Sequence, residues 1–132
     1  MNPASGKILR LGLLAAIALI VLQIVWHGWL APPRAALLWP GLALAVAPLL
    51  PGLWVARESL RRGVLICGIV GLFYFSHGVA ELWSGNAPHW LALAEILFTL
   101  VIIGASGWDA RGYKRAQKSA TAAHGSAGSA GA

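Results

Sequence analysis

The sequence predicts an all-α integral membrane protein, a four-helix bundle with both termini in the cytoplasm. Of its 132 residues, 58% are hydrophobic and 11% are charged, whereas a soluble domain carries about 25% charged residues. Polar segments separate four apolar runs, and a helix of about 20 residues crosses roughly 30 Å of hydrocarbon. Lys and Arg gather between and after these runs, so the net charge of +6 indicates membrane topology and excludes nucleic acid as a partner.

The first span is predicted over residues 11–30, after a short polar N-terminus at 1–10 that we place in the cytoplasm. A cleaved signal peptide is the alternative, but its apolar core is usually about 7–15 residues long. The run here is longer, and Trp29 stands where such a peptide needs a small residue. We therefore expect a retained span. It should end at the tight connection Ala31-Pro32-Pro33-Arg34, because consecutive prolines do not continue a helix.

The second span is predicted over residues 37–56, and two of its prolines, Pro48 and Pro51, lie in its interior. A proline removes a backbone donor and clashes with the preceding turn. We therefore expect this span to be kinked or partly opened, with neighbouring helices satisfying the freed carbonyl groups. The basic loop 57–62 follows it.

The third and fourth spans are predicted over residues 64–83 and 89–108, joined by the turn Ser84-Gly85-Asn86-Ala87-Pro88. Together with the first two they form one transmembrane domain, residues 11–110. Residues 111–132 are predicted to be a cytoplasmic tail, basic at first and then disordered, because the last part is rich in Ala, Ser and Gly without apolar periodicity.

Orientation follows from the distribution of basic residues. With four spans, nine Lys and Arg share the side of the termini and the middle loop: Lys7, Arg10, Arg57, Arg61, Arg62, Arg111, Lys114, Arg115 and Lys118. The other side has Arg34. The positive-inside rule places the nine, and with them both termini, in the cytoplasm. The seven tryptophans, which lie toward the ends of their spans, are expected to form aromatic belts at the interfaces.

Ionisable and polar side chains of three spans are predicted to share the outer half of the bilayer. They are Gln23, His27, Tyr74, His77, Glu81 and Glu95. Their spacing gives each helix one polar seam, and the seams are expected to face one another. From its depth, Glu95 should approach His77 or His27, with Glu81 nearer the outer surface beside a polar partner of its own. Small residues at 12 and 16, 68 and 71, and 104 and 107 would allow close helix contact.

Three interpretations of these residues stay open. In the first, they hold the helices together in a structural or accessory bundle. In the second, they form a proton-handling or small-ligand site, of the transport or quinone and lipid type, that opens to the periplasm. Histidine titrates near neutrality, and desolvation raises the pKa of a carboxyl group toward the same range. In the third, His27, His77, Glu81 and Glu95 bind a metal, although no HExxH, CxxC or His-rich motif supports this.

Enzymatic activity has little support in the sequence, which contains no Walker loop, GxGxxG or GxSxG motif. We expect no cofactor. The lipid bilayer is the expected partner, with a membrane protein or a second copy of the chain as further alternatives.

Three strings within the apolar runs carry a resemblance to known sequences: LQIVWHGWLAPP at 22–33, FYFSHGVAELW at 73–83 and HWLALAEILFTL at 89–100. Over residues from about 8 to about 112, the chain resembles a bacterial family of predicted inner-membrane proteins catalogued as a domain of unknown function. The resemblance implies the four-helix membrane topology. It makes His27, His77, Glu81 and Glu95 positions of the family pattern, without an assigned role.

Overall fold

The fold is seen in a computed structural model that describes residues 3–30, 38–85 and 88–129. Its elements, in chain order, are α1 (Pro3–Val25), the π-helical turn η1 (Trp26–Leu30), α2 (Leu38–Val46), the 3-10 turn η3 (Ala47–Leu49), α3 (Leu50–Ala56), α4 (Leu60–Ser84) and α5 (His89–Ser129). The described residues contain no strand. Four stretches are long and apolar enough to cross a membrane: Ser5–Leu30, Leu38–Ala56, Leu60–Ser84 and His89–Thr121. The predicted all-α fold with four spans is confirmed.

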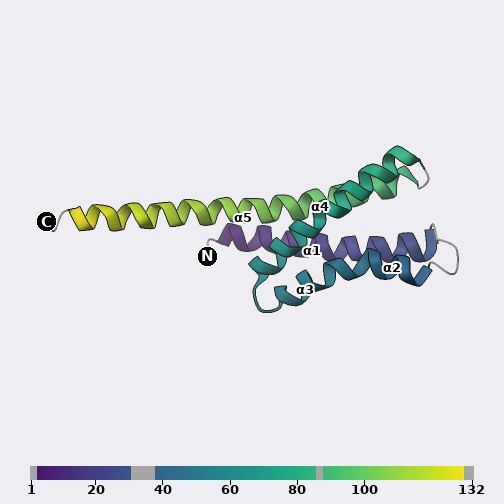
Figure 1. The fold of residues 1–132 in the computed structure, drawn as a ribbon, viewed down its shortest axis with the longest axis horizontal. Helices are drawn as coiled ribbons and strands as arrows, with labels where there is room; N and C mark the ends of the chain where they lie inside the picture. Colours follow the sequence, from purple (N-terminus) through teal and green to yellow (C-terminus); the bar gives the residue numbers. More distant parts are fainter. Residues whose placement is uncertain (1–2, 31–37, 86–87, 130–132) are drawn as a thin grey trace.

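The helices form an elongated bundle (Figure 1). In this view α1 lies between α5 and the α2–α3 segment, and α4 crosses obliquely from the level of α3 to the start of α5. Accordingly α4 packs against both α5 and α3, while α1 packs against α5. The C-terminal part of α5 extends beyond the other helices (Figure 1). This arrangement brings α1, α4 and α5, which carry the predicted polar seams, into mutual contact.

Local sequence signals set the limits of α4. Ser59 is its N-cap, in an extended conformation, and its hydroxyl accepts a hydrogen bond from the Arg62 amide. Gly85 ends the helix in the left-handed region at φ 66°, which favours glycine, and its amide donates to the Glu81 carbonyl. The predicted turn after the third span therefore begins as expected, and α5 starts directly after Pro88. Residues 86 and 87 lie outside the described residues, as do Ala31-Pro32-Pro33-Arg34.

The second span is broken, as its prolines predict. The α2 helix ends at Val46, η3 contains Pro48, and α3 begins immediately before Pro51. Close to this break the Tyr74 hydroxyl, from α4, donates a 2.7 Å hydrogen bond to the Ala45 carbonyl. A neighbouring helix thus satisfies a backbone acceptor at the irregular segment, which an apolar bilayer requires.

The buried residues form three clusters along the bundle. The central one is built from Ala15, Ala16, Leu19, Leu49, Cys67, Tyr74 and Ile102. A second contains Leu9, Val64 and Ala105, near an ion pair between Arg61 and Asp109. The Arg61 guanidinium also lies 4.2 Å from the centre of the Tyr113 ring. The third cluster, Trp26, Leu91 and Ala92, is at the opposite end of α1, where the polar seams meet.

Two helices extend beyond the predicted spans. The first helix begins at Pro3, before the predicted start of the span at residue 11, and Leu9 within it is 1% exposed. The apolar side chains at 8 and 9 extend the buried face of α1 past the polar residues at its start. At the other end, α5 continues through Ser129, into the segment that the sequence predicts to be a disordered tail. The tail is rich in alanine, which has the highest helix propensity, and it extends an existing helix without a new nucleation step.

Candidate functional site

The site is centred on Glu95, whose buried side chain joins three helices. Gln23 Nε2, on α1, donates a 2.7 Å hydrogen bond to Glu95 Oε1 on α5. His77 Nδ1, on α4, lies 3.1 Å from Glu95 Oε2. Glu95 and Gln23 are 0% and 1% exposed, whereas the His77 side chain is 35% exposed. We call Gln23, Glu95 and His77 the buried polar cluster. The prediction that Glu95 approaches His77 is confirmed.

The sequence around the buried polar cluster allows this close contact. Glu95, Thr99 and Ile102 follow helical spacing on α5, and all three are fully buried. On α4, Gly78 follows His77 directly and faces α5. A Cβ atom at Gly78 would lie 3.0 Å from Ile96 Cγ1 and 3.4 Å from Glu95 Oε2. The absence of a side chain at this position therefore lets α4 and α5 approach where Glu95 meets His77.

A tryptophan and a histidine of η1 complete the polar end of the site. His27 Nδ1 is 3.1 Å from the Gln23 carbonyl oxygen, one helical turn earlier. The Trp26 ring stacks on His27 at 5.7 Å between ring centres and lies 5.9 Å from the His77 ring. The two imidazoles are 6.3 Å apart. Trp26 and His27 begin the π-helical turn, a local widening that is frequent at functional sites.

The burial of Trp26 was missed by sequence reasoning. Its position near the outer end of the first span favours the aromatic belt, but it is 3% exposed. The other tryptophans, at 29, 39, 54, 83, 90 and 108, are between 57% and 93% exposed, as a belt requires. A sequence signal did exist, because Trp26 follows Gln23 by three residues and therefore lies on the same helix face.

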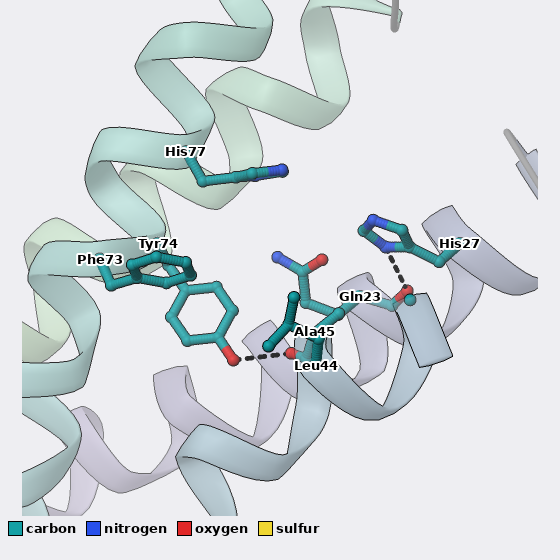
Figure 2. Close-up of a pocket in the computed structure, with 8 residues that line it drawn as sticks. Gln23, His27, Leu44, Ala45, Phe73, Tyr74 and His77 are labelled. Atoms are coloured by element: carbon teal, nitrogen blue, oxygen red, sulfur yellow. Dashed lines mark hydrogen bonds between the residues drawn. The ribbon is translucent and has the colours of Figure 1, made fainter. Parts of the chain in front are cut away.

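Beside the buried polar cluster lies a cavity of about 180 Å³ between α1, α2 and α4. It is lined by Gln23, His27, Gly41, Leu44, Ala45, Phe73, Tyr74 and His77. Figure 2 shows the Gln23 amide pointing toward the space between the two imidazoles. Phe73 and Tyr74 lie across this space from His27, on the helix that carries His77. Leu44 and Phe73 are 68% and 59% exposed. The cavity thus has a polar inner end and an apolar edge on the outside of the bundle.

One polar atom at this inner end lacks a partner. Because a carboxylate oxygen accepts hydrogen bonds, the Gln23 amide presents Nε2 to Glu95, and its Oε1 is directed elsewhere. Oε1 is buried and has no hydrogen-bond partner among the described residues. A buried acceptor without a donor costs about 1–3 kcal/mol, so a donor from a water molecule or a ligand would be favourable at this atom.

The remaining predicted site residues have distinct positions. The Tyr74 hydroxyl, on the same helix as His77, binds the Ala45 carbonyl and does not contact Glu95. Glu81 is half-buried on α4, and within the described ranges no hydrogen bond or ion pair reaches its carboxylate. Among the same residues, no group of three His, Cys, Asp or Glu side chains is close enough to hold a metal ion. The structure therefore gathers Gln23, His77 and Glu95 tightly, with His27 beside them.

The chain matches the model of a known protein family. The model of a family described as "Predicted membrane protein (DUF2069)" matches residues 11–114. The match covers the second and third spans completely, most of the first and the last, and all residues of the buried polar cluster and the cavity. No curated protein and no solved structure matches the chain significantly. The chain belongs to the DUF2069 family of predicted membrane proteins, a domain of unknown function.

Proposed function

We propose that this member of the DUF2069 family binds a small amphipathic molecule from the surrounding membrane in the cavity between α1, α2 and α4. The observation that carries the proposal is the polarity of the cavity. Its inner end has the polar groups of Gln23, His27 and His77, whereas Leu44 and Phe73 form its edge on the outside of the bundle. A ligand would place its polar group inside and leave its apolar part among the lipid chains.

The dimensions agree with a ligand of modest size. A cavity of roughly 150 Å³ in another protein interior holds one benzene molecule. The volume of about 180 Å³ therefore accommodates a ring or a short polar group with a few carbon atoms. The rest of a longer molecule would lie outside, between Leu44 and Phe73.

We place the protein in a bacterial inner membrane with both termini in the cytoplasm. Nine of the ten Lys and Arg residues fall on one side of the four spans, which supports this orientation. The cavity would then lie in the outer half of the bilayer, and the lipid bilayer is the partner from which the ligand arrives. The resemblance to bacterial inner-membrane sequences supports the location.

A structural or accessory role is the second candidate, because both Glu95 oxygens are already paired inside the protein. In that case, Gln23, Glu95 and His77 fix the register of three helices and bind nothing else. Measured hydrogen bonds between membrane helices average about 0.6 kcal/mol. This role accounts for the buried polar cluster, but it leaves the unpaired Gln23 Oε1 and the adjacent cavity without a use.

Ligand binding and a purely structural role can be distinguished by the molecules that the purified protein retains from the membrane. We would fill the cavity with Ala45→Leu, and use Ala18→Leu in the apolar groove between α1 and α5 as the matched control. Mass spectrometry of organic extracts should find a molecule that co-purifies with wild type and Ala18→Leu but not with Ala45→Leu. If all three proteins retain the same lipids in the same amounts, ligand binding is rejected and the structural role stands.

A further inference from the structure

We infer that the ligand is an apolar alcohol or phenol whose hydroxyl group donates a hydrogen bond to Gln23 Oε1. The inference rests on the proposed function, which it makes specific in chemical class. It starts from the one buried polar atom at the cavity that has no partner among the described residues. That atom is an acceptor, so the group that completes the site must be a donor.

The histidine beside Gln23 offers a second hydrogen-bond acceptor at the cavity. A backbone carbonyl only accepts, so His27 Nδ1 must carry the hydrogen in its bond to the Gln23 oxygen. In the neutral imidazole the other nitrogen, Nε2, is then an acceptor. Within the part of the chain that the structure describes, no hydrogen bond satisfies it. Two acceptors therefore lie at the polar end of the cavity, on successive turns of the α1–η1 segment.

The charges around the cavity disfavour an anionic head group. None of the eight lining residues is Lys or Arg. The buried carboxyl group of Glu95 is hydrogen-bonded to two of the lining residues, Gln23 and His77. A phosphate or carboxylate would lose its hydration without gaining a Lys or Arg partner, which is unfavourable in an apolar environment.

A cationic amine fits less well than a neutral hydroxyl for a related reason. Glu95 is fully buried and each of its oxygens is already paired. No free carboxylate among the cavity-lining residues is left to neutralise an ammonium ion. A hydroxyl group satisfies Gln23 Oε1 without bringing a charge into the membrane, and its own oxygen can accept in turn from water or from a donor side chain.

Photo-cross-linking of the full-length protein in lipid nanodiscs tests the inference. The probes are 1-dodecanol and dodecyl methyl ether, each with a diazirine in the alkyl chain, and the labelled residues are mapped by mass spectrometry. We expect the alcohol to label residues of the cavity edge near Leu44 and Phe73. Unlabelled dodecanol should compete at least tenfold better than the ether, dodecanoate or dodecylamine.

Variants test whether the preference for the alcohol over the ether depends on Gln23. Gln23→Met keeps the length of the side chain and removes the acceptor, so labelling by the alcohol should fall to the level given by the ether. Thr99→Val is the control for loss of a buried polar group, because the Thr99 hydroxyl bonds only the Ile96 carbonyl on its own helix, and it should label like wild type. Ala45→Leu, which leaves Gln23 in place, should block both probes.

The results distinguish the proposed binding of a ligand in the cavity from the inferred preference for a hydroxyl group. Equal labelling by alcohol and ether, blocked by Ala45→Leu, overturns the hydroxyl requirement and retains ligand binding. Stronger competition by dodecanoate or dodecylamine overturns the chemical class in the same way. Labelling of the cavity edge by neither probe, or labelling unchanged in Ala45→Leu, rejects the binding site itself.

Discussion

Gln23 and Glu95 are 72 residues apart in the chain, yet their side chains form a 2.7 Å hydrogen bond in the interior of the bundle. The second oxygen of the same carboxyl group meets His77. Three spans are therefore connected through one acidic side chain that is 0% exposed. Because the membrane offers no water to replace a lost partner, these connections should contribute measurably to stability.

Removing the Glu95 side chain should destabilise the protein. Glu95→Ala leaves the buried Gln23 Nε2 unpaired, at a cost of about 1–3 kcal/mol, and also removes the partner of the partly exposed His77. Glu95→Gln retains an oxygen that can accept from Gln23 and should lose less. Unfolding in mixed micelles with increasing SDS, followed by circular dichroism, measures the difference. Equal stability of Glu95→Ala and wild type would contradict a connecting role.

The Tyr74 hydroxyl should stabilise the broken second span. Tyr74→Phe removes the donor to the Ala45 carbonyl while keeping the ring, so we expect a loss of about 1–3 kcal/mol and faster amide exchange around η3. Tyr113→Phe is the matched control, because Tyr113 is exposed and contacts Arg61 through its ring, which phenylalanine keeps. Hydrogen exchange with mass spectrometry would read both variants. Unchanged exchange at η3 in Tyr74→Phe would show that the hydroxyl does not hold the break.

The orientation can be tested with the single cysteine of the chain. Cys67 is buried, so Cys67→Ser should give a background that reacts little with a membrane-impermeant maleimide. In this background we expect Ser84→Cys to be labelled on intact spheroplasts, and Ser59→Cys and Ala120→Cys only after the membrane is opened. Labelling of Ser59→Cys from outside would reverse the proposed topology.

The number of spans and the existence of the polar seams were predictable, because length, hydropathy and helical spacing are local properties. The pairing of Glu95 with His77 also followed from depth, since the two residues lie on adjacent antiparallel spans. The choice of Gln23 as the other partner, and the burial of Trp26, depend on how α1 is rotated against α5. Helical spacing places Gln23 and Trp26 on one face of the first span, but it does not say which helix that face meets, and the π-helical turn at Trp26–Leu30 interrupts the regular spacing.

The small residues also show that the sequence alone does not predict which helix faces are in contact. Three pairs were expected at helix contacts, but the structure uses two of them. A Cβ atom at Gly12 would lie 2.8 Å from Ala105 Cβ, and one at Gly68 would collide with Ser106. Gly104 and Gly107 have no described atom within 4 Å of such a position. Their spacing is that of a packing motif, but the face they occupy is turned away from α1 and α4.

Alanine substitutions should therefore separate the two kinds of glycine. Gly12→Ala forces α1 away from α5, and overpacking of this kind costs about 1–3 kcal/mol. Gly104→Ala, the same chemical change on the partner helix, meets nothing and replaces glycine by a better helix former, so stability should be unchanged or higher by up to about 1 kcal/mol. Thermal unfolding in detergent measures both. A loss in Gly104→Ala as large as that in Gly12→Ala would mean that this face of α5 is packed in the membrane, against a second copy of the chain or another membrane protein.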